Sequence, residues 1–160
     1  MNKLRKTNKM VCLDMDGTIA DLFGTPDWLD RLRNFDPSVY SEAKPLCDME
    51  LLGEVLASLI YNGWGVSIIS WGSMVSPADF TKATRKAKKD WLKKYRLPLT
   101  SVHIVKYGTP KAACIRNELE KGGYAILVDD SPENYNRWKL GDTIDPRRCD
   151  LVEALAALLD

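Results

Sequence analysis

The stretch MVCLDMDGTIAD, residues 10–21, joins a short apolar run to two aspartates, a glycine and a threonine. The run 10–13 has the length of a buried strand, and Asp14 and Asp16 follow it directly. Carboxylates two positions apart point to the same side if the chain stays extended, and Gly17 lets the chain turn away sharply behind them. The stretch therefore predicts a strand that presents two carboxylates at its carboxyl end.

Three further apolar runs alternate with segments of helical periodicity. The runs have strand length and lie at 66–69, 102–105 and 125–128. The first expected helix is 48–61, with Asp48 as its cap, and the second is 77–95, with Ser76 as its cap and Pro77 in the first turn. The third is capped by Thr109, starts with Pro110 and ends at Gly122-Gly123. A last helix starts at Asp150. Strands that alternate with helices pair in parallel through right-handed crossovers. We therefore predict a Rossmann-like, three-layer α/β/α sandwich with a mainly parallel sheet.

Length and composition fit one globular domain. The chain has 160 residues, 45% hydrophobic and 28% charged, and 23 basic against 22 acidic side chains give a formal net charge of +1. This composition excludes a disordered or fibrous protein, and no apolar stretch approaches the ~18 residues of a membrane span. We expect residues 1–160 to form a single domain in which 21–46, with a short helix near 28–33, is a small insertion. Four scattered cysteines predict reduced thiols and a cytoplasmic protein.

The residues that directly follow the four apolar runs are expected to meet, because ligands of open parallel sheets bind beyond the carboxyl ends of the strands. These residues are Asp14 and Asp16, Ser70 and Trp71, Lys106, and Asp129 and Asp130. Two carboxylates about 4 Å apart repel by about 4 kcal/mol at an effective dielectric near 20, so this group should hold protons or a cation. Carboxylates without paired His or Cys favour a hard ion such as Mg²⁺. A metal, an ammonium and a hydroxyl together describe a phosphoryl-group site.

The same residues resemble the ordered motifs of the haloacid dehalogenase (HAD) superfamily. VCLDMDGTIAD resembles the first motif, an aliphatic strand followed by DxDG[TV]. Ser70 after VSII, a lysine within 106–111, and Asp129-Asp130 after AILV stand in the order of the later motifs. The resemblance covers roughly residues 10–145, and each motif falls at a predicted strand end. It implies a HAD-type fold with a minimal cap formed by 21–46.

The resemblance also implies an activity and a role for each matched residue. Asp14 would be the nucleophile and a Mg²⁺ ligand, and Asp16 the general acid/base with its main-chain carbonyl on the metal. Asp129 and Asp130 would hold the metal directly or through water. Ser70, with Trp71 beside it, would bind the phosphoryl oxygens. An Asp at the position of Asp16 is typical of the phosphatases of the superfamily, so the resemblance implies phosphate-ester hydrolysis through an aspartyl-phosphate.

The phosphate-binding lysine is either Lys106 or Lys111. Lys106 follows the third apolar run immediately, whereas Lys111 lies in the first turn of the helix that Thr109 is expected to cap. A helix N-terminus attracts anions through its free N–H groups and its dipole, which favours Lys111.

Two substrate classes follow from the sequence. DMDGTIAD and VDDSPE are most similar to the 5′(3′)-deoxyribonucleotidase-like branch of the superfamily. This resemblance implies a 5′-nucleotidase that acts on small metabolites such as (deoxy)nucleoside monophosphates. Trp28 and Trp71 would be able to stack on the base. Residues 82–96 contain eight basic residues and one acidic residue, which suggests a phosphatase of nucleic-acid ends. We expect instead that these charges form a solvated helix face. A non-catalytic binding module is a third alternative, and the sequence indicates no membrane partner and no particular oligomeric state.

Overall fold

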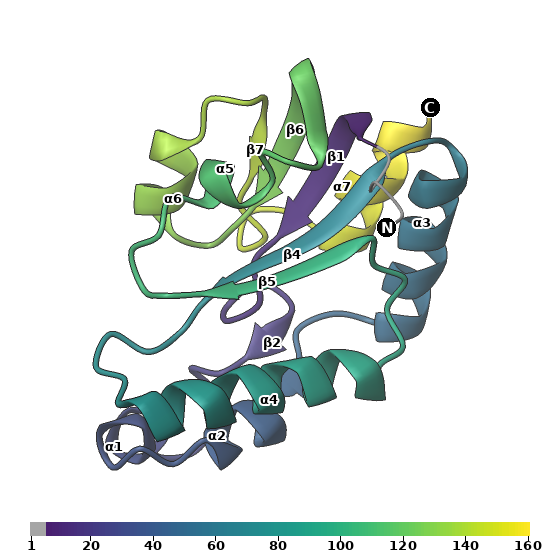
Figure 1. Ribbon diagram of the computed structural model, residues 1–160. Coiled ribbons are helices and arrows are strands. Elements are labelled where there is room, and N and C mark those ends of the chain that lie inside the picture. Colours follow the sequence, from purple (N-terminus) through teal and green to yellow (C-terminus); the bar gives the residue numbers. More distant parts are fainter. Residues whose placement is uncertain (1–5) are drawn as a thin grey trace.

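The computed structural model describes residues 6–160, which fold around a five-stranded, wholly parallel sheet (Figure 1). The strand order is β5-β4-β1-β6-β7. The bounds are β1 Thr7–Leu13, β4 Gly65–Trp71, β5 Ser101–Val105, β6 Leu119–Val128 and β7 Thr143–Ile144. All four expected strands are present, and β7 is an edge strand that the sequence did not reveal. Because β1 pairs with β4 on one side and with β6 on the other, its carboxyl end lies at the centre of the sheet.

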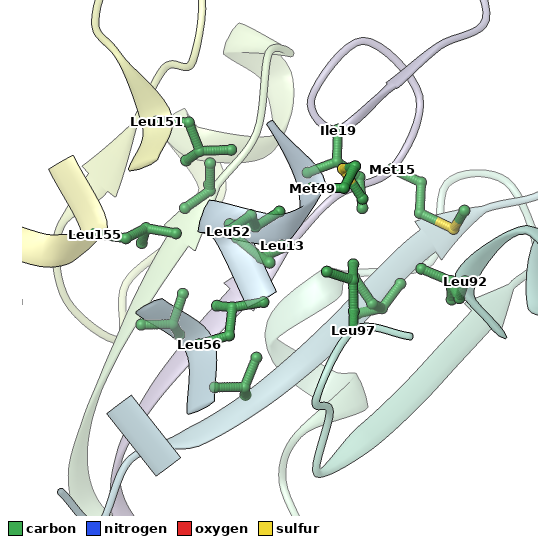
Figure 2. Packing of buried hydrophobic residues seen from close by; sticks show 14 of the residues in the cluster. Leu13, Met15, Ile19, Met49, Leu52, Leu56, Leu92, Leu97, Leu151 and Leu155 are labelled. Carbon is green, nitrogen blue, oxygen red and sulfur yellow. The ribbon is translucent and has the colours of Figure 1, made fainter. Parts of the chain in front are cut away.

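One face of the sheet is covered by α3, α4 and α7. These helices span Met49–Tyr61, Ala78–Lys94 and Leu151–Ala156, and a 3-10 turn, η1, follows at Ala157–Leu159. Alternate strand residues such as Val11 and Leu13 point to this face and are fully buried. Leu52 and Leu56 of α3 and Leu155 of α7 pack over them (Figure 2). The Asp48 and Asp150 side chains accept hydrogen bonds from the first turns of α3 and α7, which confirms the predicted cap at Asp48 and the predicted start of the last helix at Asp150.

The opposite face is covered by two short helices, α5 at Lys111–Cys114 and α6 at Pro132–Arg137. Met10 and Cys12 of β1 point to this face and contact Ile115 and Trp138. The Trp138 indole also donates a hydrogen bond of 2.8 Å to the main-chain oxygen of Ala125. Helices therefore lie on both faces, and the fold is the Rossmann-like three-layer α/β/α sandwich that the alternation of strands and helices predicted.

The insertion after the first motif begins and ends in a two-stranded ribbon. Its elements are β2 Ala20–Asp21, α1 Trp28–Arg33, α2 Ser38–Glu42 and β3 Lys44–Pro45. The strands β2 and β3 pair antiparallel, so the chain returns to the sheet beside the point where it left. Val39 and Tyr40 of α2 pack on Phe80 of α4, and α1 and α2 lie along α4 in Figure 1. We call residues 21–46 the cap.

Three expected helix boundaries are wrong. Pro110, not Thr109, precedes the first residue of α5, and no side chain caps this helix. The helix expected from Thr109 to Gly122 is limited to α5, because Leu119 pairs with Thr7 of β1 and begins strand β6. Sheet pairing here overrides the helical spacing of Ile115 and Leu119, although both are buried as expected. Pro77, not Ser76, precedes the first residue of α4, and no side chain caps this helix.

All four cysteines are free thiols. Within residues 6–160, no helix combines the length and the apolar character needed to cross a membrane.

Candidate active site

Three carboxylates converge at the carboxyl ends of the two central strands. Asp14 follows β1, and Asp129 and Asp130 follow β6. Leu13 and Val128 are partners in the parallel register, so the residues after them lie side by side. One oxygen of each carboxylate lies within 4.8 Å of the others. Asp129 is fully buried and Asp14 nearly so, which concentrates negative charge where solvent screens it poorly.

Lys111 lies between two of these carboxylates. Its Nζ donates to Asp14 Oδ1 at 2.8 Å and to Asp129 Oδ2 at 2.6 Å. Burial lowers the pKa of this ammonium, but the carboxylates of Asp14 and Asp129 outweigh burial and raise it overall, so the lysine stays charged. Lys106 is exposed after β5 and makes no contact with the carboxylates. Of the two candidate lysines, the structure therefore brings only Lys111 into the cluster.

The two aspartates after β6 differ in what holds them. Asp129 accepts hydrogen bonds from the main-chain N–H of Ser131 at 2.9 Å and from Asn134 Nδ2 at 3.0 Å. The Asp130 carboxylate has no side-chain donor among the described residues, and burial together with Asp14 and Asp129 raises its pKa to about 7. An excess of carboxylate oxygens with an unpaired member fits a hard divalent cation such as Mg²⁺. Asp14, Asp129 and Asp130 are the residues that would hold it.

Asp16 is held by a lysine of α4, one of the eight basic residues in 82–96. Lys88 of α4 is only 1% exposed, and its Nζ donates to Asp16 Oδ2 at 2.6 Å, to Ser70 Oγ at 2.8 Å and to the Trp71 oxygen at 2.8 Å. The ammonium also lies 4.7 Å from the centre of the Tyr40 ring, within the range of a cation–π contact. Burial raises the pKa of Asp16, while Lys88 opposes this shift. Lys88 therefore joins Asp16, Ser70, Trp71 and the cap in one contact set.

The prediction that residues 82–96 form a solvated face is wrong for Lys88 and holds for the other seven basic residues, which are all exposed. The missed signal is helical spacing. Lys88 lies four residues after Thr84 and three before Trp91, on the same stripe of α4 as the buried residues. A lysine in the middle of an apolar stripe needs a buried partner, and Asp16 is that partner.

Gly17 closes the turn that carries Asp16 past the cluster. Its φ of +77° is a conformation that L side chains rarely adopt. A Cβ at this position would lie 2.3 Å from Asp130 Oδ2 and 2.8 Å from Phe23. The glycine in this motif is thus required both by the backbone and by the close approach of Asp130.

A cavity of about 650 Å³ opens above the carboxylates. Asp14, Asp16, Lys111, Asp129 and Asp130 line its floor, whereas its walls are largely aromatic. The wall residues include Phe23, Trp28, Phe35 and Tyr40 from the cap, together with Trp71 and Tyr107. Phe23 and Trp28 pack edge to face with ring centres 5.0 Å apart. The Trp71 indole donates to the Thr109 oxygen at 2.8 Å and packs against Tyr107. Ser70 is fully buried, and it does not line the cavity.

The comparisons with known proteins agree with this fold. No protein-family model and no curated protein matches the sequence. A chain of the Pnkp1/Rnl/Hen1 RNA repair complex shares 16% identity with a TM-score of 0.57, over 90% of this chain and 47% of that one. The D,D-heptose 1,7-bisphosphate phosphatase from Burkholderia thailandensis shares 15% identity with a TM-score of 0.56, and the match covers 95% of this chain and 99% of that one. A protein described as a HAD-like phosphatase from Mesorhizobium loti shares 13% identity with a TM-score of 0.60, and the match covers 99% of this chain and 89% of that one.

These likenesses establish the class of fold. The chain shares its α/β sandwich with these structures, and it spans less than half of the chain that it resembles in the RNA repair complex. The site residues lie where that fold places a ligand, at the carboxyl ends of the strands on either side of the switch in strand order.

Proposed function

We propose that the protein is a Mg²⁺-dependent phosphomonoester hydrolase that acts through an aspartyl-phosphate on Asp14. The observation that carries this proposal is the contact set at the strand ends, in which Lys111 bridges Asp14 and Asp129 at 2.8 and 2.6 Å beside a 650 Å³ cavity. A buried cation next to several carboxylates suits a transition state that gathers negative charge on phosphoryl oxygens. Lys111 and the three other HAD-like motifs, which stand in the same order along the chain, support the same reaction.

The chain's own residues account for both halves of the reaction. An oxygen of Asp14 forms a bond to phosphorus while the bond between phosphorus and the leaving oxygen breaks. Asp16, whose pKa burial raises, donates its proton to the leaving oxygen and later takes one from the water that hydrolyses the phosphoaspartate. Lys111, which lines the cavity, binds a phosphoryl oxygen, whereas Ser70 is fully buried against Lys88 and does not reach the cavity. Mg²⁺, held by Asp14, the main-chain carbonyl of Asp16, Asp129 and Asp130, would neutralise the developing charge.

The walls of the cavity favour a substrate with a flat apolar group. Phe23, Trp28, Trp71 and Tyr107 all line it, and aromatic side chains stack well on a nucleobase. Small nucleoside monophosphates, the substrates of a 5′-nucleotidase, therefore fit better than sugar phosphates. Replacing Trp28 by leucine should raise KM for a nucleoside monophosphate about tenfold and leave KM for a sugar phosphate unchanged.

A hydrolysis panel tests the proposal. It compares nucleoside monophosphates, sugar phosphates, a phosphopeptide and 3′- or 5′-phosphorylated oligonucleotides, each with and without Mg²⁺. Asp14→Asn should abolish turnover, whereas Asp79→Asn, at an exposed aspartate in the first turn of α4, serves as the matched control. Full Mg²⁺-dependent hydrolysis by Asp14→Asn would refute the assigned nucleophile. Mg²⁺ and substrate binding by the wild type without any turnover would instead indicate a binding module.

A second candidate function, the processing of nucleic-acid ends, is favoured by α4. Seven exposed basic residues lie between Lys82 and Arg96, and Asp90 pairs with only one of them, Lys86. A chain of an RNA repair complex has a similar fold. A phosphorylated oligonucleotide should then bind more weakly as salt rises, with a log–log slope set by the number of phosphate contacts. Salt-insensitive hydrolysis, equal for oligonucleotide and mononucleotide, would refute it.

A further inference from the structure

A second, smaller cavity of about 260 Å³ lies beside the first. Gly72, Ser73 and Met74 line both cavities, so this short segment after β4 separates them. The second cavity is bounded by the start of α4 and the carboxyl end of β5. A molecule held by the aspartate cluster would therefore need to extend past only the segment 72–74 to reach the second cavity.

The second cavity has the opposite charge to the first. Arg85 of α4 and Lys106 after β5 line it, and none of the described residues in its lining is acidic. Arg85 and Lys106 are both exposed, and neither forms an ion pair with any residue in the range 6–160 that the structure describes. Two cations that come together from different elements without a carboxylate partner make a site for an anion.

Hydroxyl-bearing residues complete the lining. Ser73, Ser76, Thr81 and Thr84 also line the cavity, and the Ser76 and Thr81 hydroxyls hydrogen-bond to each other. Thr84 is 1% exposed, and its Oγ1 is buried without a hydrogen-bond partner among the described residues. A helical threonine normally donates to the carbonyl of the preceding turn, and a buried hydroxyl that does not is rare in folded proteins. Thr84 lines the cavity, and its unpaired buried hydroxyl is a second, independent sign of a ligand.

We propose that this cavity is a second phosphate-binding subsite, which gives the enzyme a preference for substrates that carry two phosphate groups. The inference rests on the proposed function, because it places the scissile phosphate at Asp14 and Lys111 and the other phosphate between Arg85 and Lys106. Several hydroxyls and two cations match a tetrahedral anion with three terminal oxygens. Lys106, which the sequence offered as the alternative to Lys111, thus binds the phosphate that is not hydrolysed.

Equilibrium binding to Asp14→Asn protein with Mg²⁺ tests the subsite without turnover. Calorimetry compares a nucleoside 3′,5′-bisphosphate with the nucleoside 5′-monophosphate, and a separate arm titrates wild-type protein with inorganic phosphate. The test variant is Arg85→Ala/Lys106→Ala. The charge-matched control is Arg116→Ala/Lys121→Ala, which removes one exposed arginine and one exposed lysine outside both cavities. Lys106→Ala alone provides a milder variant.

The subsite predicts that the bisphosphate binds at least about tenfold more tightly than the monophosphate, and that the test variant, but not the control, removes the difference. If the two nucleotides bind equally but inorganic phosphate occupies a second site that the test variant loses, the subsite is real and its ligand is the free anion. If neither difference depends on Arg85 and Lys106, the proposal is wrong. Failure of the proposed function would appear separately, as the absence of Mg²⁺-dependent hydrolysis of both nucleotides by the wild type.

Discussion

Replacing Lys88 by methionine should destabilise the protein strongly, because it removes the cation that holds Asp16. The lysine is buried, its Nζ makes three hydrogen bonds of 2.6 to 2.8 Å, and the Asp16 side chain is 20% exposed. Removing one partner of a buried ion pair costs about 3–5 kcal/mol, and the partial exposure of Asp16 places the loss near the lower end, at about 3 kcal/mol. For a chain of this size this corresponds to a fall in Tm of about 6–12 °C.

The loss of stability should grow as the pH rises. Burial already raises the folded-state pKa of Asp16, and Lys88 opposes the rise, so the variant has a higher pKa still. A carboxyl with a raised folded-state pKa favours folding below its unfolded pKa of about 3.9, and this contribution is lost as pH rises through the folded pKa. The difference between variant and wild type should therefore be small near pH 4 and largest near pH 8.

Urea unfolding in the absence of divalent cations measures this effect. Lys89→Met, at the exposed neighbouring lysine, is the matched control and should change the free energy of unfolding by no more than about 0.5 kcal/mol. In an Asp16→Asn background, Lys88→Met should cost at least about 1 kcal/mol less than in the wild type. A loss below about 1 kcal/mol at pH 8, or the same loss in both backgrounds, would refute the assigned ion pair.

Three further predictions concern the turn, the metal and the cap. Gly17→Ala should lower the free energy of unfolding by about 1–3 kcal/mol in urea, because of the positive φ and the contact with Asp130; a change within 0.5 kcal/mol of zero, about the size of an ordinary surface substitution, would contradict the strain. Mg²⁺ should raise Tm in wild type by mass action and much less in Asp130→Asn, and equal shifts would exclude Asp130 as a ligand. Hydrogen bonds from Ser38 and Arg31, together with the charge of Arg31, lower the pKa of Asp36. The hydrogen bond and the charge of Arg31 also lower the pKa of Glu42. These contributions to stability are present above the unfolded pKa values and are lost as pH falls through the folded ones. The protection factors of the amides in the cap should therefore fall in acid before those in β1 do; simultaneous loss of protection would oppose this reading.

The sequence predicted the centre of the site because that part depends on local pattern. Apolar runs followed by Asp14 and Asp129 identify strand ends, and parallel pairing then brings those ends together. The cap of α3 at Asp48 followed from the same kind of short-range information. These features need only a few neighbouring residues to be recognised.

The features that sequence reasoning missed depend on contacts between distant segments. The basic run alone gives no reason to bury Lys88, yet Asp16, 72 positions away in the chain, holds it in the interior. Leu119 was assigned to a helix, and pairing with Thr7 makes it a strand residue. The edge strand β7 is two residues long and has no pattern of its own. In each case the deciding partner lies far away in the sequence.

The ribbon formed by β2 and β3 has a consequence for how this protein can evolve. Because the cap leaves and rejoins the sheet at paired residues, Ala20 opposite Pro45, a change in its length costs only loop closure, at about 0.6 kcal/mol for each doubling, as long as the packing of Val39 and Tyr40 on Phe80 is kept. Selection can therefore lengthen, shorten or exchange the cap, and with it the aromatic wall that faces the substrate, while the strands that carry the aspartates stay as they are. The contact of Tyr40 with Lys88 ties an inherited change in substrate choice to the group that holds Asp16.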